Sequence, residues 1–247
     1  MRSRMLSILG LCLLGIGCTF TPHTQKQAQL PLPYYLGPDF TPNWLDEEEA
    51  NQADMHRIAP FSFTNQEGEA ISNQTVAGKI YVADFFFTFC PGICPRLTSN
   101  MAILQDTFLT DPDVLFLSHT VTPWMDSVSV LKRYAELHGV ESGKWHLLTG
   151  DKKEIYDLAR RSYFADEDIG FQRNENDFLH TENFLLIDQK GRIRGVYNGT
   201  LPLEMKNLVD DPAYAEELER LRGRTDELRD LYGGPYVPHE GEPAMLP

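Results

Sequence analysis

The sequence predicts an α/β fold in which a mixed sheet carries helices on both faces. One observation is the run from Lys79 to Phe87, which is almost continuously apolar and aromatic, as in a strand buried on both faces. A second is the order of the strand and helix patterns along the chain, ββ-α-β-α-β-α-ββ, which indicates a layered domain. The 247 residues suffice for one such domain with extensions.

The first elements lie on either side of that apolar run. Residues 61–72 alternate between apolar and polar side chains around a turn that contains Gly68, which predicts a hairpin. After the run, apolar residues recur at helical spacing and predict a helix with one buried face: Leu97, Met101, Leu104 and Phe108. Residues 114–117 then predict a second buried strand.

The next helix is expected to open at Asp126 and to end at His138-Gly139. Its expected inward face consists of Val130, Leu131, Tyr134 and Leu137. Residues 145–148 predict a third strand, and a pattern like a capping box at Asp151 predicts the helix that follows.

The end of the domain is predicted to be a closing hairpin, formed by residues 184–187 and 192–197. Before it, residues 164–178 are acidic and irregular, and loops of this length are more often functional than not. Beyond the hairpin, residues 210–232 predict a charged helical extension, and residues 233–247 predict a disordered tail.

The amino terminus has the features of an export signal. Arg2 and Arg4 precede an apolar core at residues 6–16, which is shorter than the roughly 20 residues that span a bilayer. The core ends at Gly15-Ile16-Gly17-Cys18, which resembles the bacterial lipobox. We therefore expect residues 1–17 to be a lipoprotein signal peptide and Cys18 to be lipidated, with an ordinary secretory signal as the alternative.

This expectation places the protein on a membrane, exported as a bacterial lipoprotein that faces the periplasm. Residues 18–55 are rich in proline and predict a tether whose second half lies against the domain of residues 56–209. The net charge of −14 disfavours binding to nucleic-acid phosphates.

The chemistry of the chain converges on Cys90 and Cys94. If Cys12 is removed with the signal and Cys18 is acylated, these two are the remaining free thiols. The buried strand delivers Cys90 to its carboxyl end, and Cys94 falls in the first turn of the next helix, where the helix dipole favours thiolate. The spacing brings both sulfurs within reach of each other or of one metal ion. A purely structural disulfide is the alternative.

Two reactive thiols can exchange disulfides or bind a soft metal. Structural zinc would require four protein ligands, and the sequence has no second cysteine pair to provide them. Two thiolates and one imidazole suit copper, because thiolate favours Cu(I) and imidazole also binds Cu(II). His180, just before residues 184–187, is the candidate imidazole, and His119 at the end of the second strand is the second candidate.

Residues 87–95 read Phe-Thr-Phe-Cys-Pro-Gly-Ile-Cys-Pro and, together with Asp126 and His180-Thr181, resemble the Sco/SenC family. These are copper-binding, thioredoxin-like proteins that assist assembly of cytochrome c oxidase. The resemblance covers residues 58–208 and implies a thioredoxin-like fold. It also implies that Cys90, Cys94 and His180 are copper ligands. Many relatives carry Asp at the position of Gly92, so the charge beside this site is one unit less negative.

Three functions follow as hypotheses. The first is a copper metallochaperone that binds one ion through Cys90, Cys94 and His180 and supports maturation of the copper site of cytochrome c oxidase. Its partner would be the copper-site subunit of that oxidase or another cuproenzyme. The second is a thiol-disulfide oxidoreductase in which Cys90 and Cys94 are the redox pair. The third is a copper-responsive sensor or scaffold that recruits a partner through its C-terminal helices.

Overall fold

A five-stranded mixed sheet organises the protein, whose computed structural model describes residues 32–52, 55–165 and 181–210. The strand order is β7-β6-β5-β8-β9. The strands β5, β6 and β7 pair in parallel, whereas β8 is antiparallel to both of its neighbours, β5 and β9. The strands are β5 (Ile80–Phe86), β6 (Val114–Thr120), β7 (Trp145–Leu148), β8 (Asn183–Ile187) and β9 (Ile193–Asn198).

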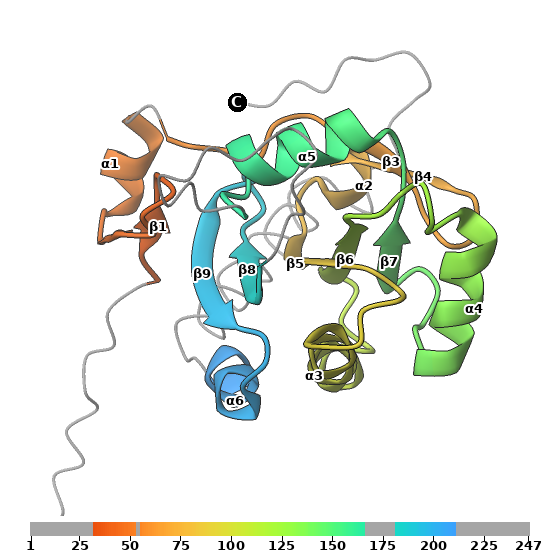
Figure 1. The fold of residues 1–247 in the computed structure, drawn as a ribbon. Helices are drawn as coiled ribbons and strands as arrows, with labels where there is room; N and C mark the ends of the chain where they lie inside the picture. Colours follow the sequence, from red (N-terminus) through yellow and green to blue (C-terminus); the bar gives the residue numbers. More distant parts are fainter. Residues whose placement is uncertain (1–31, 53–54, 166–180, 211–247) are drawn as a thin grey trace, which may run out of the picture.

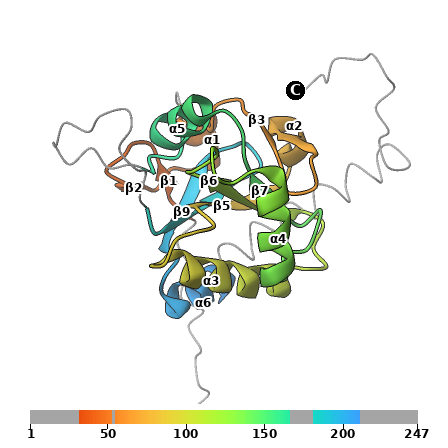
Figure 2. The ribbon, with the colours of Figure 1, turned by 45° about the vertical axis from the view of Figure 1, so that its right-hand side comes forward.

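Helices cover both faces of the sheet, which confirms the predicted fold class (Figure 1). One face packs against α5 (Lys152–Arg161), with β3 (Ser62–Thr64), β4 (Ala70–Ser72) and the short α2 (Asn73–Val76). The other face packs against α3 (Cys94–Thr107), α4 (Val128–His138) and α6 (Pro202–Asp210). Figure 2 shows α3 and α6 side by side beneath the sheet.

Two hydrophobic cores result, one on each side of the sheet. The core under α5 contains Phe63, Phe85 and Ile155, and the core above α3 contains Leu97, Met101 and Phe116. Every residue of β5 and β6 is buried, because each of these strands has a neighbour on both sides and a helical layer on both faces.

The helix α4 ends at His138, before Gly139, as predicted, but it differs from its predicted form at its start and on its inward face. It begins at Val128 with Ser127 as its N-cap, so Asp126 lies before the helix rather than opening it. Its buried residues are Leu131 and Ala135, and the prediction that Leu137 faces inward is wrong, since its side chain is 79% exposed. Leu137 follows Leu131 by six residues, about 240° around the helix axis, which puts the two on different faces.

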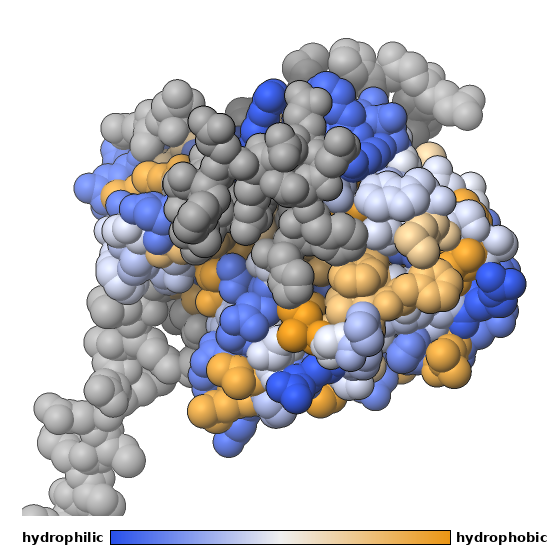
Figure 3. Space-filling model, in the orientation of Figure 1, coloured by the Kyte–Doolittle hydropathy of each residue, from blue (hydrophilic) through white to orange (hydrophobic). Residues whose placement is uncertain are grey.

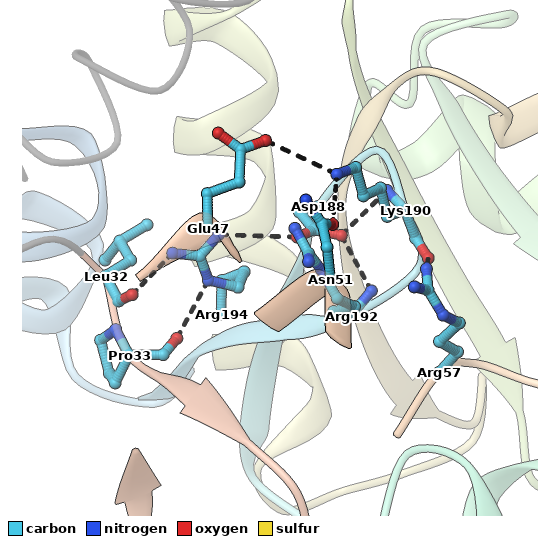
Figure 4. Close-up of polar contacts among 9 residues, drawn as sticks. All are labelled: Leu32, Pro33, Glu47, Asn51, Arg57, Asp188, Lys190, Arg192 and Arg194. Atoms are coloured by element: carbon cyan, nitrogen blue, oxygen red, sulfur yellow. Dashed lines mark hydrogen bonds and ion pairs between the residues drawn. The ribbon is translucent and has the colours of Figure 1, made fainter. Parts of the chain in front are cut away.

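The segment ahead of the domain packs beside β9, as Figure 1 shows. It contains β1 (Tyr34–Tyr35), β2 (Pro42–Asn43) and α1 (Glu47–Gln52). Two buried guanidinium groups hold it in place (Figure 4). Arg194 donates to the carbonyl oxygens of Leu32 and Pro33 at 2.6 and 3.0 Å, and its guanidinium lies 4.0 Å from the Tyr34 ring.

A single carboxylate is paired with both guanidinium groups of this cluster. Asp188 accepts from Arg192 at 2.7 Å and lies 3.5 Å from Arg194 Nη1, so two buried cations share one anion. Arg192 also lies 4.8 Å from the ring of Tyr34, and the aromatic face between the two guanidinium groups offsets part of the excess positive charge. Outside the buried cluster, Lys190 Nζ reaches Asn51 at 2.9 Å.

Some expectations fall outside the described residues. These are the signal peptide, Cys18, the first part of the tether, His180 and the chain beyond residue 210. Within the described ranges, no helix combines the length and the apolar composition that crossing a membrane requires.

Candidate metal and thiol site

The two cysteines lie together at the carboxyl end of the central strand, as the sequence predicts. The strand β5 ends at Phe86, a short connection carries Cys90, and α3 begins at Cys94 with Pro95 in its first turn. Cys90 is half-buried. Cys94 is only 4% exposed and belongs to the hydrophobic core between α3 and the sheet. Both are free thiols in the structure. One sulfur therefore meets solvent and the other is protected behind it.

The surroundings of the two thiols shift their pKa values in opposite directions. Partial burial opposes ionisation of Cys90, but hydrogen bonds from the Cys94 thiol and from the backbone N–H groups of residues 92–94 lower its pKa overall. Burial, together with the hydrogen bond that it donates to Cys90, raises the pKa of Cys94 to about 12. Cys90 is thus the more acidic and more nucleophilic of the two thiols, and Cys94 is the one that retains its proton more strongly.

A buried carboxyl group lies beneath the thiols. Asp84, on β5, is 3% exposed and accepts a hydrogen bond from the Ser118 hydroxyl, whose oxygen in turn accepts from Trp145 Nε1 at 2.8 Å. Burial raises the pKa of Asp84 to about 7, although the bond from Ser118 opposes this rise. Its charge contributes to the raised pKa of Cys94. No local motif marks Asp84 as part of the site, and a charged residue within an apolar strand is the one signal that the sequence offers.

A second carboxylate fixes the loop that carries Cys90. Asp126 is completely buried and accepts a 2.5 Å hydrogen bond from the Thr88 hydroxyl and a 2.8 Å bond from the Thr122 hydroxyl. The Thr88 hydroxyl bonds Oδ1, whereas Oδ2 accepts from the Thr122 hydroxyl and also from the Thr120 hydroxyl and the backbone N–H of Thr88. These bonds join the β5–α3 connection to the β6–α4 connection. The sequence pattern indicated a helix start at Asp126 and gave no sign of this role.

The described histidines do not complete the site. His119 lies on the opposite face of the sheet from Cys94, inside a box of Phe61, Phe63, Phe85 and Tyr163 whose ring centroids are 5.2 to 6.0 Å away. It is fully buried and neither ring nitrogen has a hydrogen-bond partner. The second-choice assignment of His119 as a ligand is therefore wrong for this structure.

Three other histidines have contacts of their own. These are His56 against Ser162, His138 against Tyr134, and His146 against Asn65. Among residues 32–52, 55–165 and 181–210, no three His, Cys, Asp or Glu side chains form a metal-binding group. The thiol pair itself has the donor chemistry that suits a soft ion such as copper.

Comparisons with known proteins point to one family. The SCO1/SenC family model matches residues 49–209. The SCO1 protein homolog of Bacillus subtilis is 30% identical over 166 residues, which cover 66% of this chain and 85% of that protein. A SCO1/SenC family lipoprotein from Bacillus anthracis is 31% identical, with a TM-score of 0.56 over 63% of this chain and 92% of that one.

Two further solved structures share the fold. One is BsSco, a member of the Sco family of cytochrome c oxidase assembly proteins in which a disulfide switch has been identified. It is 30% identical with a TM-score of 0.53, over 65% of this chain and 93% of that one. The other is Arabidopsis thaliana ScoI with copper bound, 23% identical with a TM-score of 0.51, over 66% and 98% of the two chains. The fold is therefore thioredoxin-like, as predicted, and the chain belongs to the SCO1/SenC family.

Proposed function

We propose that this protein is a copper metallochaperone that binds one copper ion through Cys90, Cys94 and His180. It would deliver the ion to the copper site of cytochrome c oxidase or of another cuproenzyme. The observation that carries the proposal is the thiol pair at the carboxyl end of β5, in which the Cys94 thiol donates a hydrogen bond to Cys90. Family membership, with a copper-bound structure among its members, supports the same function.

The donor set explains why copper is the cargo. Thiolates bind Cu(I) strongly, and an added imidazole makes the site suitable for Cu(II) as well. A half-buried Cys90 lets a partner approach the ion, so that a bond from the partner forms as the bond to Cys90 breaks. Because both thiols must lose their protons to bind the ion, copper affinity is expected to rise with pH.

The test is copper titration of the full chain and of His180→Ala. We expect stoichiometric copper with a Cu(II)–thiolate absorption in the wild type, and loss of that absorption in the variant with both thiols still oxidisable. His138→Ala is the matched control, because this ring lies on α4 against Tyr134 and not at the thiols. An unchanged copper spectrum in His180→Ala would remove His180 from the site.

Thiol-disulfide exchange is the second candidate, and the opposite pKa shifts of the two cysteines favour it. Cys90 thiolate would attack a partner disulfide, and Cys94 would then displace the partner, leaving a Cys90–Cys94 disulfide and two partner thiols. His180→Ala should keep this activity. A reduced wild-type protein that fails to hold stoichiometric copper against a mild competitor, yet reduces a partner disulfide, would favour this function over copper delivery.

We also propose that Cys18 carries the lipid that anchors the protein to a membrane on its periplasmic side. The lipobox-like sequence at residues 15–18 supports this, as does the lipoprotein in the same family. Residues 18–55 would then form the tether. Growth with a labelled fatty acid should label the wild type but not Cys18→Ser, and label retained by the variant would contradict the assignment.

A further inference from the structure

Three large apolar side chains on the connections that follow β5 and β6 are exposed to solvent. Phe89 is 65% exposed, Trp124 57% and Met125 48%. We call these three residues the apolar rim. Phe89 directly precedes Cys90, and the other two lie in the connection between β6 and α4. Figure 3 shows hydrophobic residues gathered on this face, over the two connections. Exposed apolar residues that lie together, rather than singly, mark interaction sites.

The rim is held in a fixed shape. The Asp126 carboxylate, which immediately follows Met125, accepts the hydroxyl hydrogen of Thr88, which immediately precedes Phe89. The two connections are also joined by a 2.9 Å backbone bond from Val121 N–H to the Phe86 carbonyl. A preformed surface loses little conformational entropy on binding, so even a small one can contribute to affinity.

The rim also has a positive charge beside it. Lys152 Nζ lies 5.1 Å from the centre of the Trp124 ring and 5.2 Å from that of Tyr156. Trp124 nevertheless remains more than half exposed, so its ring is open to a partner while Lys152 is positioned at its side.

The position of the thiols identifies the occupant. Cys94 is buried, so a protein that takes a ligand bond or a disulfide bond from this pair must reach Cys90. A protein surface that brings its own sulfur or nitrogen atom to Cys90 also covers Phe89, the next residue, and with it the adjoining connection. Three side chains form a small contact, which suits a partner that must leave after transfer rather than remain in a permanent complex.

We propose that the apolar rim is the docking surface for the protein that accepts copper from this site. The partner presents its copper ligands within an apolar surface that covers the rim. This inference rests on the proposed function, but it concerns the route of transfer and not the binding of the ion. A second copy of this chain and a membrane surface are the competing occupants.

The experiment compares transfer to a protein with transfer to a small molecule. The full chain, the double variant Trp124→Ser/Met125→Ser and the variant Phe89→Ser are loaded with copper. Each is mixed with the soluble copper-site domain of the oxidase from the same cell, or with a small copper chelator. Leu137→Ser is the matched control, because Leu137 is an exposed apolar residue on α4 outside the rim.

We expect the rim variants to load copper fully and to transfer it to the protein domain about tenfold more slowly, as expected for loss of a small hot spot. Transfer to the chelator should stay within about twofold of wild type, and Leu137→Ser should match wild type in both assays. Equal rates to the protein domain for wild type and rim variants would overturn the proposal. The proposal would also be overturned if the rim variants transferred copper equally slowly to the protein domain and to the chelator. That result would mean that the rim affects release of the ion rather than contact with the partner.

Two further measurements separate the remaining outcomes. If the wild type holds no copper, the proposed function fails, and the rim is then tested by reduction of the oxidised domain, with a small aromatic disulfide as the comparison. If the rim variants reduce the oxidised domain more slowly than wild type but reduce the small disulfide at the same rate, the rim is still supported as the docking surface. Light scattering and vesicle flotation complete the test, since self-association or binding to anionic vesicles that is lost in the rim variants would assign the rim to those occupants instead.

Discussion

The Thr88 hydroxyl donates to the Asp126 carboxylate across 2.5 Å, and this bond joins the segment that carries Cys90 to the connection that carries Trp124 and Met125. Asp126 is fully buried, so its carboxyl oxygens need such donors in place of water. The arrangement fixes the reactive thiol and the exposed rim relative to each other, because both are next to residues of the same hydrogen-bond network.

Replacing Thr88 tests this bond. Thr88→Val keeps the shape but removes the donor, so the free energy of unfolding should fall by about 1.5–3 kcal/mol, the value of a hydrogen bond to a charged group. Thr88→Ser keeps the hydroxyl, so its free energy of unfolding should fall by less than about 1 kcal/mol. Urea denaturation measures both. An equal loss in the two variants would mean that the methyl group, and not the hydrogen bond, carries the contribution.

Gly92 provides a test of the charge beside Cys90. A Cβ atom at this position would lie 3.9 Å from Cys90 Sγ, an ordinary contact, so a side chain fits there. The carboxylate of Gly92→Asp should raise the pKa of Cys90 and slow its alkylation about threefold to tenfold at neutral pH, from Coulomb interaction near the surface. Gly92→Asn is the uncharged control. The difference between the variants should shrink at 1 M salt, and an equal slowing in both would indicate steric hindrance.

The buried His119 predicts an acid-sensitive stability. Burial lowers the pKa of His119 to about 3, from the ordinary value of 6.5 in the unfolded chain. The unfolded state therefore takes up a proton first as pH falls. Between pH 6.5 and pH 3 the free energy of unfolding should decrease by up to about 1.4 kcal/mol per pH unit from this group.

His119→Phe should remove that component. It also deletes two buried nitrogens without hydrogen-bond partners, so the variant should be more stable than wild type by roughly 1–3 kcal/mol at pH 5. Denaturation at pH 5 and pH 8 measures the effect. A wild type and a variant with parallel pH profiles would show that His119 is not the group that titrates.

The Asp188 cluster predicts an order of destabilisation. Asp188→Asn would leave two buried guanidinium groups, Arg192 and Arg194, without their shared anion, and should cost about 3–5 kcal/mol. Arg194→Met leaves Asp188 paired with Arg192 alone, so the free energy of unfolding should fall by less than in Asp188→Asn. The same variant should release residues 32–52 from the domain and speed their proteolysis. Denaturation and limited proteolysis test the two effects, and the reverse order of stability would show that charge balance does not govern the cluster.

The parts of the fold that the sequence predicts are those that local pattern encodes. The run from Lys79 to Phe87 contains β5, and the helical face at Leu97, Met101 and Leu104 is buried in α3 as expected. The positions of Cys90 and Cys94 follow from these two elements alone. By contrast, Leu137 fits an apolar helical pattern but lies exposed, because a residue's burial depends on which face of α4 meets the sheet.

The parts that the sequence does not predict depend on residues far apart in the chain. Asp126 meets Thr88 across 38 positions, and Arg194 meets Leu32 across 162. No local pattern indicates such pairs. The assignment of His180 to the site likewise rests on its place before β8 and on the family resemblance, and it stays a prediction that the copper titration addresses.

The clamp between Arg194 and the carbonyl groups of Leu32 and Pro33 has a mechanical consequence. A pull on the chain ahead of Leu32 reaches β9 directly through these hydrogen bonds, so the load enters the sheet at its outermost strand. The strand β5, which leads to the cysteines, lies two strands away. The force reaches it only through the β9–β8 and β8–β5 pairings. A force applied at the N-terminal end of the described chain is therefore expected to disturb β9 before it disturbs the geometry of the thiols.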